Sequence, residues 1–186
     1  MKKICLLDVR IVLPRFSTAT STSRKKHKSA KESNECLDGR TFLTHVGYRR
    51  TDGMSDLVAY VDGGSLGNPG PAGIGVVIDG SGRGKIRIAR WIGRQDNNVA
   101  EYVALLEALQ YALALKAKAL HVYSDSEVVV RQMRGEYTCR SPRLYSLNWI
   151  CRKLARSLVF SISHVGRENN REANGLANYA VRKRLS

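Results

Sequence analysis

Apolar and polar residues alternate along five stretches of the chain, and we predict a β-strand for each. The five stretches are residues 57–63, 73–79, 85–93, 119–124 and 158–163. A period of two residues is typical of a strand with one face buried. In the third stretch, isoleucines alternate with Arg87 and Arg90, with one slip between Ala89 and Trp91, so this strand is expected to expose a basic face. Short turns join the first three stretches, which predicts an antiparallel meander.

Four other stretches have helical periodicity, and they follow or separate the later strands. They are residues 98–118, 127–134, 142–156 and 169–184. The first is apolar nearly all round, so it is expected to be deeply buried, and the last should turn Ala173, Ala177 and Ala180 inward. Alternation of strands and helices in the second half favours parallel pairing. The sequence therefore predicts an α/β fold: a five-stranded mixed sheet, three strands antiparallel and then two parallel, with helices on both faces.

Residues 1–53 differ in composition from the rest of the chain. Residues 17–35 are rich in Ser, Thr and Lys without apolar periodicity, so we predict a disordered basic extension followed by a folded domain over residues 54–186. Three explanations of the extension stay open. It is a targeting presequence, a flexible nucleic-acid-binding arm, or an upstream stretch that translation from Met54 would omit.

The chain is strongly basic, with a formal net charge of +15 that divides almost equally between the extension and the remainder. Such a charge favours a polyanionic partner, either nucleic acid or an anionic membrane surface, although solubility alone is an alternative. The 4 cysteines show no metal-binding spacing, and no apolar run approaches the roughly 18 residues of a membrane span. We therefore expect reduced thiols, no membrane insertion and a cytoplasmic location. An organellar location is the alternative if the extension is a presequence.

Three carboxylates occur where predicted elements end or begin. Asp62 ends the first strand, Asp125 follows the fourth, and Glu101 lies on the first turn of the long helix. Parallel strands bring their carboxyl ends to one sheet edge, so the three side chains should converge and bind a hard cation such as Mg²⁺. Two ions roughly 4 Å apart would suit a phosphodiester displacement. Each residue also has a local explanation: Asp62 as a turn former, Glu101 in a capping box with Asn98, and Asp125 as a helix cap.

Four blocks of sequence resemble type 1 ribonuclease H, and they occur in the order found in that family. The blocks are DGGSLGNPGPAG (62–73), NNVAEYVALLEAL (97–109), YSDSEVVVRQM (123–133) and HVGRENNREANGLAN (164–178). The resemblance covers residues 57–182. It implies metal-dependent hydrolysis of the RNA strand of RNA–DNA hybrids, leaving 5′-phosphate and 3′-hydroxyl ends. It also implies that Asp62, Glu101 and Asp125 bind the metal, with Mn²⁺ as a substitute for Mg²⁺.

The resemblance assigns roles to further positions. His164 matches the family histidine on a mobile loop, which moves protons or helps product leave. The residues that match family positions around the hybrid backbone and its 2′-hydroxyls are Gly63, Asn68, Asn97 and Asn98. Their ordinary roles, as turn and cap residues and a surface histidine, are the alternative.

The chain departs from the family pattern at two places. Asn174 occupies the position of the usual fourth acid, so metal affinity and activity are expected to be weakened but retained. Only residues 135–141 separate the short helix from the next, which is too short for the extra basic helix of some members. The leading hypothesis is a monomeric hybrid-cleaving endoribonuclease. The alternatives are a catalytically silent domain that binds hybrid or double-stranded RNA, and a nuclease that prefers another duplex.

Overall fold

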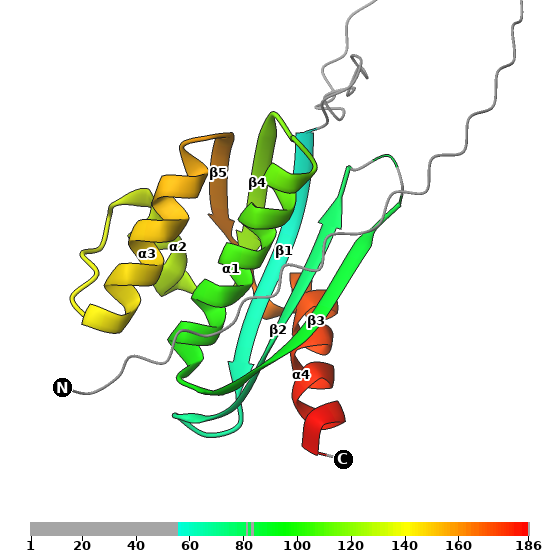
Figure 1. Cartoon of the computed structure of the whole chain (residues 1–186), viewed down its shortest axis with the longest axis vertical. Coiled ribbons are helices and arrows are strands. Elements are labelled where there is room, and N and C mark those ends of the chain that lie inside the picture. Colours follow the sequence, from blue (N-terminus) through cyan, green and yellow to red (C-terminus); the bar gives the residue numbers. More distant parts are fainter. Residues whose placement is uncertain (1–55, 81, 83, 186) are drawn as a thin grey trace, which may run out of the picture. The chain divides into compact units, whose positions relative to one another are not determined.

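One mixed sheet forms the framework of the chain. The computed structural model describes residues 56–80, 82 and 84–185, so the expectations for residues 1–53 lie outside the described residues. The strands are β1 (Asp56–Ser65), β2 (Gly70–Asp79), β3 (Ile86–Gln95), β4 (Ala119–Ser124) and β5 (Val159–His164). They lie in the order β3-β2-β1-β4-β5 (Figure 1). Both pairs among β1, β2 and β3 are antiparallel, whereas β4 is parallel to β1 and β5 is parallel to β4. The predicted fold class is confirmed.

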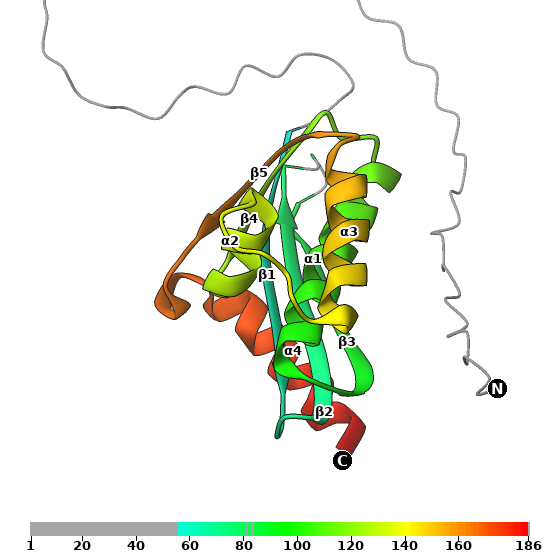
Figure 2. The ribbon, with the colours of Figure 1, turned by 90° about the vertical axis from the view of Figure 1, so that its left-hand side faces the viewer.

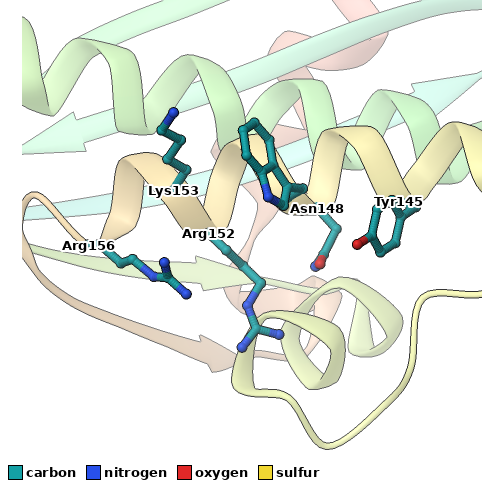
Figure 3. Close-up of a pocket in the computed structure, with 6 residues that line it drawn as sticks. Tyr145, Asn148, Arg152, Lys153 and Arg156 are labelled. Carbon is teal, nitrogen blue, oxygen red and sulfur yellow. The ribbon is translucent and has the colours of Figure 1, made fainter.

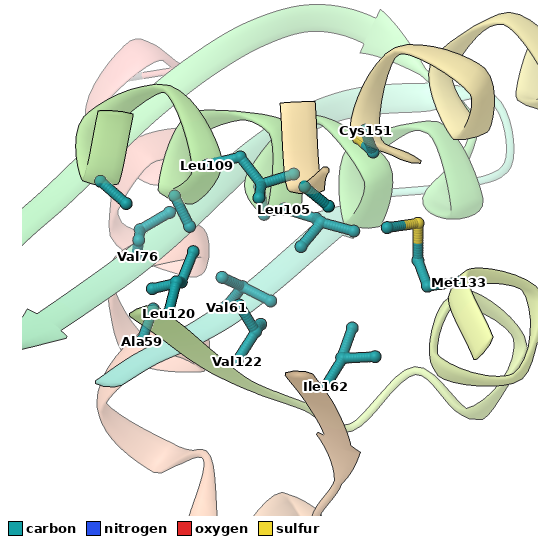
Figure 4. Close-up of a cluster of buried hydrophobic side chains, with 14 of the residues drawn as sticks. Ala59, Val61, Val76, Leu105, Leu109, Leu120, Val122, Met133, Cys151 and Ile162 are labelled. Carbon is teal, nitrogen blue, oxygen red and sulfur yellow. The ribbon is translucent and has the colours of Figure 1, made fainter. Parts of the chain in front are cut away.

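Helices cover both faces of the sheet. They are α1 (Asn97–Ala114), α2 (Glu127–Arg134), α3 (Pro142–Ala155) and α4 (Arg171–Leu185), with a 3₁₀ turn, η1 (Arg167–Asn169), before the last. The first three pack on one face and enclose the main core, in which Val61 and Val76 of the sheet meet Leu105 and Leu109 of α1 (Figure 4). The last helix, α4, covers β1, β2 and β3 on the opposite face (Figure 2).

The predicted long helix is correct in kind but wrong at both ends. It begins at Asn97 rather than Asn98, with Asp96 as the N-cap residue, and it ends at Ala114 rather than Lys118. The end is set by Lys116, which adopts a left-handed φ of 54°. The Ala117 N–H then bonds back to the Ala112 carbonyl at 3.0 Å, the arrangement that commonly closes a helix. Glycine usually occupies such a position. Because lysine occupies it here, nothing in the local sequence indicated that the helix ends at this point.

Two smaller differences lie near the chemistry. Helix α4 begins at Arg171 rather than residue 169, because residues 167–169 form η1. The slip predicted between Ala89 and Trp91 lies later in the strand: pairing with β2 is regular through Trp91, and the register shifts between Trp91 and Gly93. The fourth strand and the second helix have the predicted bounds. Within residues 56–185 as described, none of the helices has the length and apolar character needed to cross a bilayer.

Candidate active site

Asp62 lies near the C-terminal end of β1 and is 4% exposed. Its pairing partner on β2 is Gly75. A Cβ at position 75 would lie 2.0 Å from the Ala173 carbonyl oxygen, so only glycine lets α4 pack this closely against β2. The close approach brings the start of α4, including Asn174, beside Asp62.

A second close contact brings Glu101 to the same point. A Cβ at Gly63 would lie 2.1 Å from the Ala100 carbonyl carbon, so α1 lies directly against the end of β1. The Gly63 N–H donates to Glu101 Oε2 at 3.2 Å, and Glu101 is 6% exposed. Glycine at position 63 therefore serves both the packing of α1 and the orientation of the carboxylate.

Asp125 follows β4, whose last residue, Ser124, is in register with Val61 of β1. Asp125 therefore emerges beside Asp62. Asn170 Nδ2 donates to both the Val61 carbonyl and Asp125 Oδ1, each at 2.9 Å. Arg167 Nε lies 3.3 Å from Asp125 Oδ2. The segment between β5 and α4 thus attaches to the end of the sheet and orients this carboxylate.

The three carboxylates form one cluster. Asp62, Glu101 and Asp125 each offer an oxygen, and these oxygens all lie within 4.8 Å of one another. Burial, followed by the charge of Asp125 and a hydrogen bond with it, raises the pKa of Asp62 to about 7. Burial and the charges of the other two raise the pKa of Glu101 well above its ordinary value. Oxygen ligands held together against their repulsion fit a hard divalent cation, which would relieve that repulsion.

Asn174 lies at the cluster as expected for the fourth position. Its side chain hydrogen-bonds with Asp62 and lowers the pKa of that carboxyl, against the larger effects that raise it. Asn178 Nδ2 donates to Asn174 Oδ1 at 2.8 Å. An amide lowers the pKa of a carboxyl when it donates to the carboxylate, so the NH₂ group of Asn174 faces Asp62 while its oxygen accepts from Asn178.

The fifth strand extends one residue beyond its predicted end and includes His164. His164 is the last residue of β5, paired with Ser124 and exposed. Its role in moving protons stays a prediction. Two residues separate β5 from η1, and Arg167, the first residue of η1, contacts Asp125 together with Asn170.

The asparagines predicted to bind substrate lie at the start of α1. Asn68 Oδ1 accepts the Asn97 N–H at 3.1 Å, which ties the β1–β2 hairpin to the helix. Asn98 is exposed inside the first turn. The predicted capping box of Asn98 with Glu101 is wrong because Asp96 is the N-cap residue.

Two residues at the cluster were not predicted: Arg167 and Asn170. Both lie in a polar run between the last strand and the last helix. Such runs are common in loops, and nothing local distinguishes these two side chains from their neighbours. Asn170 is 1% exposed although it is polar, so its importance becomes visible only once its buried contacts are known.

The fold and the cluster together define a class of protein. It is an α/β domain with a mixed five-stranded sheet and three converging carboxylates beside the ends of two central parallel strands. The model of the family described as "Reverse transcriptase-like" matches residues 60–180. Solved ribonuclease H1 structures are similar over nearly their whole length, and the chain belongs to the type 1 ribonuclease H family.

Individual relatives support this assignment. Ribonuclease HI of Halobacterium salinarum is 38% identical over 125 residues, which is 66% of this chain and 63% of the relative. The crystal structure of RNase H1 from the same archaeon has a TM-score of 0.65 at 36% identity, covering 69% of this chain and 98% of that one. The structure of LC11-RNase H1 in complex with an RNA/DNA hybrid has a TM-score of 0.65 at 37% identity, covering 70% of this chain and 100% of that one. The chain spans less than two thirds of the length of the first curated relatives that it matches, 63% for the Halobacterium protein and 35% for the bifunctional protein Rv2228c of Mycobacterium tuberculosis.

Proposed function

We propose that this chain hydrolyses the RNA strand of RNA–DNA hybrids with the help of divalent metal. The observation that carries the proposal is the convergence of Asp62, Glu101 and Asp125, whose oxygens lie within 4.8 Å of one another, in a chain of this family. The hybrid bound to LC11-RNase H1, at 37% identity, supports the choice of substrate.

The three carboxylates would hold the metal, for which we propose two Mg²⁺ ions with Mn²⁺ as a substitute. When bound, such ions stabilise the charge that develops on the attacking and leaving oxygens of a phosphodiester. Asn170 and Arg167 keep Asp125 in place, at 2.9 Å and 3.3 Å from its two oxygens. The Gly63 N–H does the same for Glu101. These contacts preorganise the ligands before substrate arrives.

The products follow from which bond breaks. A water molecule loses a proton as its oxygen bonds to phosphorus, the bond between phosphorus and the 3′ oxygen breaks, and the 3′ oxygen takes up a proton. The ends are therefore a 5′-phosphate and a 3′-hydroxyl. We propose His164, exposed at the end of β5, as a group that carries protons to or from this reaction.

Substrate would be bound beside the N-terminus of α1. Gly63, Asn68, Asn97 and Asn98 lie at or next to this helix end, where free N–H groups and the helix dipole favour phosphates. Asparagine side chains can both donate to and accept from a 2′-hydroxyl, which is the group that distinguishes RNA from DNA. Backbone contacts of this kind give little sequence preference and a strong dependence on salt.

One observation supports a second candidate function. Asn174 donates to Asp62 instead of adding a fourth negative charge. A domain with weaker metal binding for this reason could bind hybrid or double-stranded RNA without cleaving it. The proposed nuclease and this binding domain differ in turnover, which an assay with saturating Mn²⁺ separates.

The test is cleavage of an end-labelled hybrid by wild-type protein, Glu101→Gln and Glu107→Gln. Glu107 lies on the same helix and pairs with Arg90 on β3, so its substitution makes the same chemical change away from the cluster. We expect the wild-type protein and Glu107→Gln to cleave the hybrid in the presence of Mg²⁺ or Mn²⁺. Glu101→Gln should cleave it at least about a hundredfold more slowly, because removing one group that stabilises the charge of the transition state causes a loss of this size.

Three outcomes would contradict the proposal. Equal cleavage by Glu101→Gln would mean that the cluster is not the site or that the activity is a contaminant. Hybrid binding without cleavage at saturating Mn²⁺ would favour the binding domain. Faster cleavage of double-stranded RNA than of hybrid would assign a different substrate.

A further inference from the structure

The outward face of α3 combines aromatic rings with uncompensated positive charge. From residue 137 to residue 167 the chain contains no Asp or Glu, although arginine and lysine recur throughout. The inner face of α3 is buried through Asn148, Cys151 and Ala155, which pack toward α1 and α2. The charged residues on the other side are therefore not needed for the core.

A groove of about 330 Å³ lies on this face (Figure 3). It is lined by Tyr145, Asn148, Trp149, Arg152, Lys153 and Arg156. Tyr145 and Trp149 are 58% and 53% exposed, and they lie four residues apart, so their side chains are neighbours on the helix surface. Exposed aromatic side chains that lie next to one another form the kind of surface patch that marks a binding site.

The cations of the groove are not neutralised by carboxylates. Lys153 Nζ lies 5.0 Å from the centre of the Trp149 ring. Arg152 donates to the Gln132 carbonyl at 3.5 Å. Within the part of the chain that the structure describes, neither these two nor Arg156 forms an ion pair with a carboxylate.

Two arginines of β3, by contrast, are paired with carboxylates. On β3, Arg87 lies 2.6 Å from Glu172 and Arg90 lies 2.7 Å from Glu107. The cations of the groove therefore keep a positive charge that Arg87 and Arg90 share with carboxylates, which favours an anionic partner.

We propose that this groove binds single-stranded nucleic acid. Exposed aromatic rings stack on bases whose faces are free, whereas the bases of a duplex are already stacked on each other. Arginine and lysine beside the rings meet the phosphates of the same strand. A lipid surface would need a broad apolar face, but here the two rings are surrounded by charged and amide groups.

The groove is separate from the proposed nuclease site, since none of the three clustered carboxylates lines it. It would hold a single strand that extends from a hybrid or an independent single strand. The binding proposal does not depend on cleavage, and the two can fail independently.

The experiment uses the fact that the chain has 2 tryptophans. Trp91→Phe leaves Trp149 as the fluorescent reporter, and Trp149→Phe leaves Trp91, which lies on β3 with Arg184 over its ring at 5.1 Å. Each full-length variant is titrated with oligothymidylate in EDTA, so no cleavage occurs. We expect quenching of Trp149 that saturates and little change in Trp91.

Charge is tested by fluorescence anisotropy of labelled oligothymidylate. The double variant Arg152→Gln/Arg156→Gln should bind oligothymidylate at least about fivefold more weakly. The slope of log affinity against log salt concentration should become shallower by about 1.4, since each phosphate contact to a single strand contributes about 0.7. The matched control, Arg87→Gln/Arg90→Gln, removes the same charge from paired positions and should change affinity less than twofold. Circular dichroism confirms that both variants are folded.

Several results would overturn the proposal. Trp149 fluorescence unchanged at saturating oligothymidylate would exclude contact at the groove. Equal weakening in both double variants would mean that only total charge matters. A blue shift of Trp149 with phosphatidylserine vesicles, without oligothymidylate binding, would assign the face to a membrane instead.

Discussion

Asp62→Asn should stabilise the metal-free protein at neutral pH, although Asp62 is proposed to be essential for activity. The buried carboxyl lies beside Glu101 and Asp125, and its pKa is raised to about 7 by burial and by Asp125. The folded protein therefore binds a proton at Asp62 that the unfolded chain releases above its ordinary pKa. The stability that this proton contributes is fully present below the ordinary pKa of an aspartate, and it is lost as the pH rises through the pKa of Asp62 in the folded protein.

The magnitude follows from the size of the shift. The pKa of Asp62 rises from 3.8 to about 7. Each pKa unit corresponds to about 1.4 kcal/mol, so ionised Asp62 lowers the free energy of unfolding by up to about 4 kcal/mol. Asparagine keeps the shape of the side chain without the charge. We expect Asp62→Asn to gain about 2–4 kcal/mol at pH 8 and only about 0.5 kcal/mol at pH 4.

The assay is urea unfolding in EDTA at pH 4, 6 and 8, followed by far-ultraviolet circular dichroism. Asp79→Asn is the control, because Asp79 is an exposed residue at the end of β2. Adding Mg²⁺ should stabilise the wild type, by about 2.7 kcal/mol at a hundred times its dissociation constant, and stabilise Asp62→Asn much less. A loss of stability at pH 8, or a gain of equal size at every pH, would refute the conclusion that the carboxylates repel one another.

Two further substitutions test the surroundings of the site. Asn174→Asp should raise the rate of hybrid cleavage up to about tenfold, which corresponds to about 1.4 kcal/mol of additional transition-state stabilisation. The same substitution should lower the stability of the metal-free protein, because a fourth negative charge replaces a hydrogen-bond donor to Asp62. Initial rates and urea midpoints measure the two effects, and an unchanged rate would show that the amide already suffices. Tyr102→Phe removes a hydroxyl that donates to Gln132 Oε1 at 2.7 Å and accepts from Asn148 Nδ2 at 3.0 Å. It should lower the free energy of unfolding by about 1–3 kcal/mol, because two buried amides each lose a partner. A change below about 0.5 kcal/mol in urea unfolding would contradict that account.

The main elements were predictable because their signals are local. The alternation in residues 119–124 and the apolar period of residues 127–134, closed by Gly135, predicted β4 and α2 with their observed bounds. The end of α1 was not predictable in this way. It depends on Lys116 in a left-handed conformation, which the residue type does not favour and which the local sequence does not reveal.

The site was predictable for a different reason. Asp62 lies near the end of β1 and Asp125 follows β4, two strands that alternation identifies, and parallel pairing brings such ends together. What could not be predicted was which neighbours complete the cluster. Asn170 and Arg167 reach Asp125 because η1 and α4 follow a short connection from β5. The sequence contains many similar polar residues, and only their contacts with Asp125 separate these two from the rest.

The order of residues thus determined which segments form strands and helices and which carboxylates lie near their ends, since both properties depend on side chains close together in the chain. The packing of α1 and α4 decided the rest, because it rests on contacts between distant segments. Gly63 and Gly75 allow two helices to lie against β1 and β2 at distances that no side chain would permit. That close approach brings Glu101 and Asn174 to Asp62, and it turns three separate acids into one charged site.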